Sequence, residues 1–376
     1  MKAANALAQR LQSQANAHGP LPFNVYMEQA LYDPTHGFYS RDDAPYADYF
    51  TSVSVHPALF GQLLAAHLDD VWRRLGQPDP FRIVELGAAD GRLARQIRDA
   101  AGQFPWGGSL TYVGVERAPA SHAADSLDVL YRSIDEIPAS DAAAILSNEF
   151  FDALPVRLAR RTPTGWVEEC VAFEGGKAFL TDRPAPAELR SYADRYAGAT
   201  PTDGRMEVRQ GVETIYRHAA RLGEKIVMTS IDYGGDSATV HSERLAAGTL
   251  LAYRRHQASD DVLANPGEAD LTTHVNFTQL IDAGRSQGFD SFRMGQQADF
   301  LAALGVGDHL VRFQERADAT LETYRAEREA VFQLVSPTDL GRFQVLTQGK
   351  GVDLDAIRGL TTTRSDEGAG LDADAN

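Results

Sequence analysis

The sequence predicts an α/β protein built on a doubly wound, mostly parallel β-sheet. Short apolar segments with strand character alternate with helical segments, which is the pattern of βαβ units. A turn with two glycines, at residues 85–91, follows the first of these strands and precedes a helix. The chain of 376 residues is too long for one minimal domain and suits one elaborated domain, or a domain with a satellite.

Helices are expected before the sheet. An Ala- and Leu-rich helix over 1–18 ends at a Gly-Pro pair, and a short helix over 23–30 leads into a Pro- and Gly-containing loop at 31–38. Residues 60–75 place apolar side chains at helical spacing and predict another helix. We therefore expect residues 1–75 to form a helical N-terminal cover.

The strands of the sheet are expected where short apolar segments occur. They lie at 81–86, 110–115, 129–132, 143–146, 225–231 and 248–253, with a helix over 92–101. The gap at about 153–224 is expected to hold a β-hairpin, 156–161 with 166–173, and then a helix over 205–222. We interpret this gap as an insertion in the sheet domain, and we expect a long helix over 308–333.

These elements define the expected domain organisation. Residues 76–350 form the sheet domain, and residues 351–376 form an acidic C-terminal tail. An exposed apolar face on the 308–333 helix could serve a homodimer. No internal repeat and no long low-complexity tract interrupts this arrangement.

The charge balance argues against one class of partner. Lys and Arg total 36 against 52 Asp and Glu, a net charge of −16, which disfavours non-specific binding of nucleic acid. The single cysteine, Cys170, cannot form an intramolecular disulfide or a Cys-rich zinc site. No apolar run approaches the ~20 residues of a membrane-spanning helix, and the first residues lack the apolar stretch of a signal peptide. We therefore expect a soluble cytoplasmic protein with no nucleic-acid or membrane partner.

The glycine turn is the first candidate ligand site. Glycine is needed where the backbone turns tightly or approaches a ligand without a Cβ in the way. Gly87 and Gly91 flank Ala89, and this spacing differs from the G-x-G-x-x-G turn, which disfavours a nicotinamide oxidoreductase. The segment resembles the E-x-G-x-G-x-G turn of class I S-adenosylmethionine (SAM) methyltransferases, with one glycine changed. The alternative is a purely structural strand-to-helix corner.

This resemblance implies a set of cofactor contacts. SAM would bind with its methionine part beside the turn, at Glu85, Gly87, Ala88 and Gly91. Glu116 ends the second strand, where a carboxylate can accept hydrogen bonds from both ribose hydroxyls, although alone it could be a solvated charge. Ile134 and Asp135 end the third strand, where this fold usually contacts adenine.

A polar and aromatic cluster, Asn148-Glu149-Phe150-Phe151-Asp152, follows the fourth strand. The carboxyl end of a strand in an α/β sheet is the usual place for a ligand. Carboxylates there can hold an amine or a guanidinium, and aromatic rings can exclude water or stack on a planar cation. Alternatively, Asn148 and Asp152 cap the following turn while the rings fill the core, and both interpretations can hold at once. Glu149 and Asp152 are the candidate catalytic residues, which hold or deprotonate the methyl acceptor, and Asn148 is a candidate cofactor contact.

Longer segments make the resemblance specific. The chain is similar to the MidA/NDUFAF7-type family of class I SAM-dependent methyltransferases over about residues 20–350. The matching segments include NEFFDALPV at 148–156, YRRH at 253–256, and segments at 26–39, 48–52, 231–234 and 266–272. The resemblance implies a Rossmann-like sheet and SAM as cofactor, with Phe50 and Thr51 closing over it. Mitochondrial members of the family resemble arginine N-methyltransferases that act on a subunit of respiratory complex I.

The sequence departs from the family at two places. Thr51-Ser52-Val53-Ser54 stands where the family usually has Thr-Ala/Ser-Pro-Glu, which bears on the acceptor because the segment is expected to border the active site. Ala89 replaces the middle glycine of the turn and adds only a methyl group.

We expect a SAM-dependent methyltransferase whose acceptor is a protein arginine. A small-molecule nitrogen or oxygen nucleophile is the alternative acceptor, and a non-catalytic assembly or scaffold protein that retains the fold is the alternative from another class. We expect no metal site, because His256, Asp270 and His274 match no compact ligand motif. A serine hydrolase is unsupported, because the chain has no G-x-S-x-G elbow.

Overall fold

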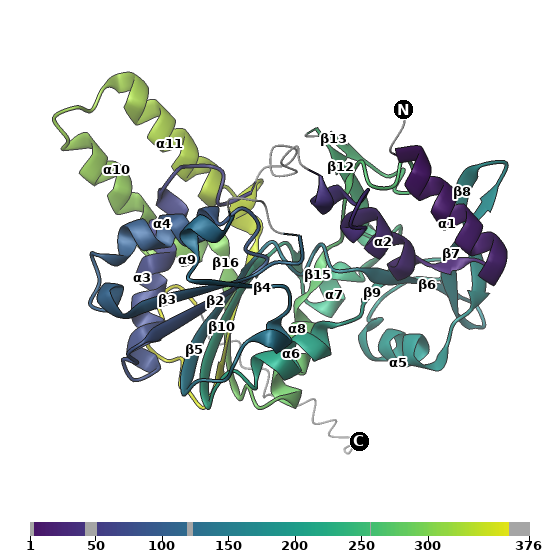
Figure 1. The fold of residues 1–376 in the computed structure, drawn as a ribbon, viewed down its shortest axis with the longest axis horizontal. Coiled ribbons are helices and arrows are strands. Elements are labelled where there is room, and N and C mark those ends of the chain that lie inside the picture. The colour runs from purple at the N-terminus through teal and green to yellow at the C-terminus, as the bar shows by residue number, and fades with distance from the viewer. Residues whose placement is uncertain (1–3, 42–50, 119–122, 256, 361–376) are drawn as a thin grey trace, which may run out of the picture.

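A seven-stranded sheet forms the centre of the protein (Figure 1). The computed structural model describes residues 4–41, 51–118, 123–255 and 257–360. The strands are β2 (Phe81–Leu86), β3 (Leu110–Val115), β4 (Val129–Tyr131), β5 (Ala142–Asn148), β10 (Lys225–Asp232), β16 (Ser291–Gln296) and β17 (Gln344–Lys350). Their order is β16-β17-β10-β5-β2-β3-β4; the strands from β10 to β4 are parallel, and β17 is antiparallel to both of its neighbours. The predicted fold class is therefore confirmed.

Helices cover both faces of this sheet (Figure 1). One face carries α3 (Leu59–Arg74), α4 (Arg92–Ala101) and α9 (Gln297–Ala303), and the other carries α6 (Val212–Ala219) and α8 (Phe277–Ser286). Successive side chains of a strand point to opposite faces. Ile83 and Val84 are therefore both fully buried on β2 yet belong to different hydrophobic clusters, one on each face.

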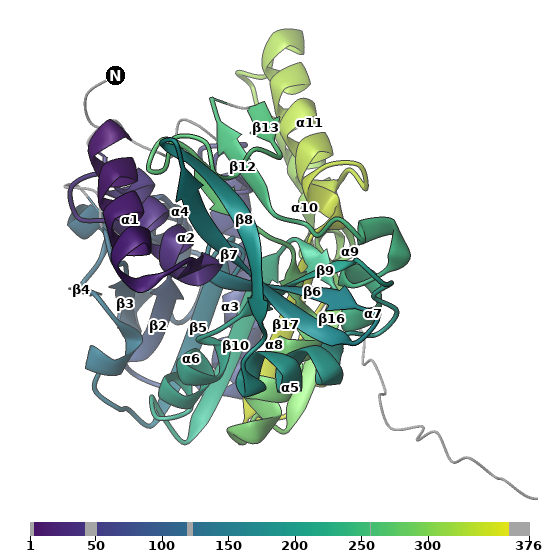
Figure 2. The same cartoon turned by 90° about the vertical axis from the view of Figure 1, so that its right-hand side faces the viewer.

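A second, antiparallel sheet lies beside the first (Figures 1 and 2). It contains β1 (Leu21–Pro22), β6 (Val156–Thr162), β7 (Gly165–Glu174), β8 (Lys177–Pro184) and β9 (Arg205–Arg209). The predicted hairpin is confirmed, because β6 and β7 pair in antiparallel register. Two N-terminal helices, α1 (Ala4–His18) and α2 (Phe23–Tyr32), share a hydrophobic cluster with β6 and β7, and α5 (Ala187–Tyr196) packs in a separate cluster with β6 and β9.

Three predicted elements are wrong. The segment 205–222 is not one helix: β9 comes first, and Gly211, with φ of 93°, begins α6. The long helix over 308–333 is two helices, α10 (Val306–Gln314) and α11 (Leu321–Val335), because Thr320 forms a capping box with Thr323 and starts a new helix. The segment 248–253 adds no strand to the main sheet.

The strand that overlaps segment 248–253 is β12 (Leu251–Arg254). It belongs to a separate three-stranded sheet with β13 (Gln257–Ser259) and β14 (Asp270–Thr272). The remaining short elements are β11 (Gly234–Gly235), β15 (Val275–Asn276), α7 (Ser237–Val240) and the 3-10 turns η1 (Phe38–Ser40), η3 (Gly107–Ser109), η4 (Ala123–Ser126), η5 (Ile134–Glu136), η6 (Glu243–Leu245) and η7 (Leu340–Arg342).

The ends of the chain pack differently from the expected domain organisation. Within residues 1–75, α1 and α2 pack on the second sheet, whereas α3 packs on the main sheet. The first part of the expected tail is not a tail, since Val352, Leu354 and Ile357 are buried in the core of the main sheet. Residues 361–376 lie outside the described residues, and the domain limits themselves remain predictions.

Candidate active site

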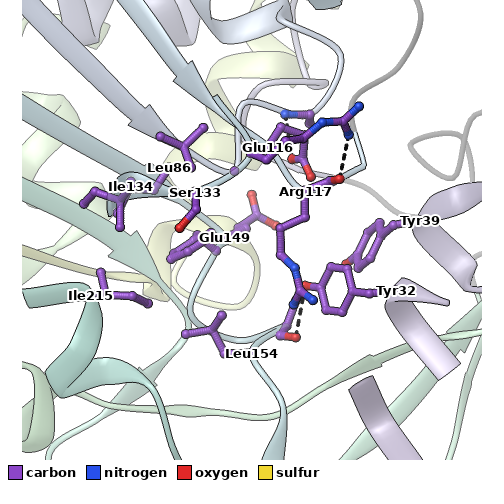
Figure 3. A pocket seen from close by; sticks show the side chains of 16 residues that line it. Tyr32, Tyr39, Leu86, Glu116, Arg117, Ser133, Ile134, Glu149, Leu154 and Ile215 are labelled. Atoms are coloured by element: carbon purple, nitrogen blue, oxygen red, sulfur yellow. Dashed lines mark hydrogen bonds between the residues drawn. The ribbon is translucent and has the colours of Figure 1, made fainter. Parts of the chain in front are cut away.

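Three cavities meet where the parallel strands end. The strand cavity, about 210 Å³, is bordered by residues that follow β2, β3, β4 and β5, and Figure 3 shows its side chains. The turn cavity, about 80 Å³, lies along the glycine turn. The acidic cavity, about 310 Å³, lies beyond the loop after β5. Among the described residues that line them, Glu149 borders all three, and Gly87 and Ala89 border the first two.

The glycine turn adopts a left-handed backbone that suits glycine. Gly87, Ala89 and Gly91 have φ of 75°, 50° and 72°. A Cβ on Gly87 would lie 3.0 Å from the ring of Phe150, so a side chain here would force that ring to shift. Gly91 is the N-cap of α4 and lines none of the three cavities, so its role in the structure is to shape the turn.

Glu116 ties the turn to the end of β3. Its carboxylate accepts hydrogen bonds from the backbone N–H of Ala89 at 3.0 Å and of Ala118 at 3.1 Å. A carboxylate offers about four lone-pair positions, so two remain for a ligand. Glu116 lines the strand cavity, where the sequence predicts a ribose contact.

The rest of the strand cavity is mostly apolar. Its walls include Leu86, Ile134, Phe150, Leu154 and Ile215, with Ser133 as a polar neighbour (Figure 3). An apolar slot beside a carboxylate is a suitable shape for a flat base joined to a ribose. The structure corrects one predicted contact here: Asp135 is exposed, lines none of the three cavities and accepts a hydrogen bond from Ser133.

The turn cavity collects most of the predicted contacts to the methionine part of SAM. It is lined by Thr51, Glu85, Gly87, Ala88 and Asn148, among others. Phe50 lies outside the described residues. The Glu85 carboxyl accepts a hydrogen bond from the Tyr112 hydroxyl at 2.9 Å, and its burial raises its pKa to about 8. Asn148 Oδ1 is buried without a hydrogen-bond partner, which leaves an acceptor for a ligand's ammonium group.

The acidic cavity gathers buried carboxyl groups from separate segments. Glu149, Asp152 and Asp270 line it, and burial raises the pKa of each, to about 8 for Glu149 and about 7 for Asp270. Their mutual repulsion adds to the rise, because the charge of Asp152 acts on the other two. Asp152 Oδ2 accepts a hydrogen bond from the Tyr233 hydroxyl at 2.7 Å, whereas Asp152 Oδ1 is buried with no partner. A cation entering this cavity would restore the ionised form of these carboxyl groups.

The loop after β5 is held in a strained shape that points Glu149 into the junction. Glu149 has φ of 50°, a conformation that costs a non-glycine residue of order 1 kcal/mol or more. Its carboxylate accepts hydrogen bonds from Ser52 N at 3.1 Å and from Asn148 Nδ2 at 3.0 Å. Asp232 at the end of β10 accepts hydrogen bonds from the N–H groups of Phe151, at 3.0 Å, and of Asp152, and thereby fixes the loop.

The structure does not show the predicted caps, because Asn148 Oδ1 and Asp152 Oδ1 have no hydrogen-bond partner, and the two aromatic rings of the cluster have different surroundings. Phe151 is buried in the core, while Phe150 lines the strand cavity, and the two rings meet edge to face at 5.2 Å.

Tyr39 and Tyr233 also line the acidic cavity, and neither was predicted as a site residue from the sequence. The family resemblance at 231–234 was a signal for Tyr233, but it assigned no role to this residue.

Asp270 and His274 also line the acidic cavity, although the sequence analysis considered them only as metal ligands. Burial lowers the pKa of His274 to about 4, so its ring is neutral at physiological pH. His256 lies outside the described residues.

Within the described ranges, one group of side chains has the spacing of metal ligands: His56, His309 and Glu327. His56 Nδ1 accepts hydrogen bonds from the N–H of Ala58 at 3.1 Å and of Leu59 at 2.9 Å. The neutral ring therefore carries its proton on Nε2 and donates it to Glu327, so this nitrogen has no lone pair for a metal. The group instead connects α10 and α11 to the start of α3.

The fold and the three cavities define a class of protein, the class I SAM-dependent methyltransferases. The parallel strands end in a glycine turn, the carboxylate of Glu116 and an apolar slot, and an acidic cavity adjoins them. The sequence shows which family of that class this is. A family model described as "Putative S-adenosyl-L-methionine-dependent methyltransferase" matches residues 63–295, and the chain belongs to this family.

Curated relatives and solved structures agree with this assignment. A Drosophila melanogaster protein named "Protein arginine methyltransferase NDUFAF7 homolog, mitochondrial" is 26% identical over 92% of this chain and 85% of its own length. The Danio rerio protein named "Protein arginine methyltransferase NDUFAF7, mitochondrial" is 27% identical over 90% of this chain and 86% of its own length. A Burkholderia thailandensis crystal structure with bound S-adenosyl-homocysteine (SAH) superposes with a TM-score of 0.81, at 28% identity over 96% of both chains. The predicted enzyme class and cofactor are confirmed: the protein is a SAM-dependent methyltransferase of the MidA/NDUFAF7 type.

The prediction of a cytoplasmic protein is wrong. The relatives from Drosophila melanogaster, Danio rerio and Rattus norvegicus all carry the word mitochondrial in their names. Composition could not reveal this, because net charge and the absence of a long apolar run do not distinguish aqueous compartments. In the part of the chain that the structure describes, no helix combines the length and the apolar character needed to cross a membrane.

Proposed function

We propose that the enzyme transfers the methyl group of SAM to the guanidinium of an arginine in a partner protein. The observation that carries the proposal is the unpaired, buried Oδ1 of Asp152 in a cavity shared with the carboxyl groups of Glu149 and Asp270. A guanidinium offers five N–H donors in a planar fork, which suits several carboxylates better than the compact ammonium of lysine does. The curated relatives are named protein arginine methyltransferases, which supports the same acceptor.

We assign SAM to the strand and turn cavities. Glu116 and Ile134 would hold the adenosine part, and Glu85, Gly87, Ala88, Thr51 and Asn148 would surround the methionine part. The unpartnered Asn148 Oδ1 and the missing Cβ at Gly87 are the features that fit this group. When bound, SAM supplies an electrophilic methyl group on a sulfonium.

Glu149 is the proposed proton acceptor. It borders both the cofactor cavities and the acidic cavity, so its carboxylate can hold the acceptor nitrogen beside the cofactor and take its proton. Asp152 holds a second nitrogen of the guanidinium through its free oxygen, and Phe150 keeps water from the junction.

The direct test uses methyl-labelled SAM and a mitochondrial protein extract, with the labelled residue identified by mass spectrometry. Label on arginine side chains, dependent on the enzyme, is the expected result. Label confined to lysine residues or to small molecules would contradict the proposed acceptor while leaving the methyltransferase class intact.

An Asp152→Asn substitution should separate acceptor binding from cofactor binding. It keeps the shape of the side chain and the hydrogen bond from Tyr233, but it removes the charge that faces the acceptor. Losing an ionic hydrogen bond to a cation costs about 1.5–3 kcal/mol, so we expect kcat/KM for an arginine peptide to fall roughly ten- to a hundredfold. SAM affinity, measured by calorimetry, should change less than about threefold. Near-normal turnover would remove Asp152 from the acceptor site.

The raised pKa of Glu149 predicts a pH dependence. Burial, with a contribution from Asp152, raises this pKa to about 8, and a proton acceptor must be ionised. We expect kcat/KM to increase with pH up to a plateau above pH 8, because kcat/KM reports the free enzyme. The corresponding rise in kcat should occur at lower pH, because the bound cation stabilises the carboxylate. Steady-state kinetics on both sides of pH 8 test this prediction. It would be contradicted if kcat/KM and kcat had the same pH dependence.

A further inference from the structure

Tyr39 occupies the boundary between the cofactor and acceptor cavities. Among the described residues, Tyr39 and Glu149 are the two that line both the strand cavity and the acidic cavity. Two neighbouring rings fix the ring of Tyr39: it stacks on Tyr32 at 5.3 Å and 29°, and it meets Phe38 edge to face at 5.2 Å. Figure 3 shows Tyr32 and Tyr39 side by side at the edge of the strand cavity.

On the acceptor side, the hydroxyl of Tyr39 donates a hydrogen bond to Asp270 Oδ1 at 2.9 Å. Asp270 is 4% exposed and lies on β14, far from Tyr39 in sequence. Burial and the charge of Asp152 raise the pKa of Asp270 to about 7, and the hydrogen bond from Tyr39 opposes this rise. Tyr39 therefore favours the ionised form of a carboxyl group in the acidic cavity.

On the cofactor side, a cation contacts the Tyr32 ring, on which Tyr39 stacks. The guanidinium of Arg117 lies 4.2 Å from the centroid of the Tyr32 ring and forms an ion pair with Glu28 on α2. Arg117 follows Glu116, the proposed ribose contact, and lines the strand cavity. A continuous set of contacts thus runs from the cofactor cavity through the two rings to Asp270.

We propose that Tyr39 is a positioning residue for methyl transfer, holding the Asp270 carboxylate toward the acceptor cation while its ring forms one wall of the passage opposite Glu149. This inference rests on the proposed function, since it takes the acidic cavity as the site of the acceptor. It adds Asp270 as a further carboxylate that contacts the cation, and it assigns the N-terminal segment a part in catalysis.

Removing the hydroxyl has a predictable effect on charge. The titratable groups that act on Asp270 or feel its charge come from three other segments: Tyr32 and Tyr39, Glu149 and Asp152, and Tyr253 on β12. His274, Asp339 and the guanidinium of Arg342 line the same cavity and are unchanged by the substitution. Without the donor, the pKa of Asp270 rises further, and a smaller fraction is ionised near neutral pH. Cation affinity therefore decreases, and the pH at which it is lost on acidification moves upward.

The test is calorimetric titration of acetyl-arginine amide and of acetyl-lysine amide into the full-length protein saturated with SAH. We expect Tyr39→Phe to weaken binding of the arginine probe by about tenfold and to move the midpoint of its pH dependence to higher pH. SAH affinity should stay within about twofold. In an Asp270→Asn background, Tyr39→Phe should cause no further loss, because the group that it positions has lost its charge.

Tyr196→Phe is the matched control, because the Tyr196 hydroxyl donates to Asp282 Oδ2 at 3.0 Å and lines none of the three cavities. Equal probe affinity and pH dependence in Tyr39→Phe and wild type would overturn the inference, as would an equal loss in Tyr196→Phe. So would the same loss from Tyr39→Phe in the Asp270→Asn background. Binding of the lysine probe alone would overturn the arginine acceptor, and equal affinity of Tyr39→Phe and wild type for that probe would overturn the inference on Tyr39 as well. Binding of neither probe at millimolar concentration would overturn both proposals.

Discussion

A Glu149→Gln substitution is expected to lower kcat by about a thousandfold, within the range of about 10²–10⁴ that a positioned proton acceptor contributes. Glutamine keeps the length of the side chain, and its carbonyl oxygen can still accept the hydrogen bond from Ser52 N that holds Glu149 at the junction. The amide cannot take a proton, so the loss should lie in turnover. SAM affinity should stay within about threefold, because the contacts on the cofactor side do not depend on this charge.

Three measurements on the Glu149→Gln protein test this expectation: single-turnover rate, SAH affinity and melting temperature. Removing a buried carboxyl group with a raised pKa should not lower the melting temperature. If the single-turnover rate is unchanged, a group other than Glu149 takes the proton from the methyl acceptor. The neutral ring of His274 in the same cavity would then be the residue to replace next.

A Glu116→Ala substitution is expected to weaken SAM and SAH binding by at least about thirtyfold. It removes the proposed ribose contacts, and it also removes the acceptor for the N–H of Ala89, which holds the glycine turn against the end of β3, and for the N–H of Ala118. A hydrogen bond to a charged group is worth about 1.5–3 kcal/mol, and ~2 kcal/mol corresponds to this factor.

Asp135→Ala serves as the comparison for Glu116→Ala. The sequence predicts an adenine contact at Asp135, whereas the structure leaves this carboxylate exposed and outside the cavities. We expect unchanged SAH affinity by calorimetry for Asp135→Ala. A loss equal to that of Glu116→Ala would restore the sequence-based assignment.

Local patterns predicted the five parallel strands, and those at 81–86 and 110–115 match β2 and β3 to the residue, but β16 and β17 were not predicted. A buried strand is a short apolar run, and this signal does not depend on distant residues. The same signal failed at 205–222, where the alternating apolar residues of β9, Met206 and Val208, precede a glycine that separates them from α6. Apolar residues at helical spacing continue on both sides of that glycine, so the strand was included in the predicted helix.

The site could be predicted only where its residues are close in sequence. Glu149 and Asp152 were found because they follow one strand, and Glu116 because it ends another. Tyr39 and Asp270 meet only because the N-terminal segment folds over the ends of the strands, and no local pattern links positions so far apart. The left-handed backbone at Glu149, which directs its carboxylate, is also invisible in the sequence, because glutamate carries no preference for that conformation.

The acidic cavity is assembled from separate parts of the chain: η1, the loop after β5, the sheet of β12 and β14, and the residues around η7 that precede β17. The cofactor cavities draw mainly on the ends of β2 to β5. The β12, β14 and η7 residues line the acidic cavity alone, so under the proposed function we expect substitutions there to change acceptor preference without changing SAM affinity. On this division of the site, acceptor choice and cofactor binding depend on different parts of the chain, and the two can change independently.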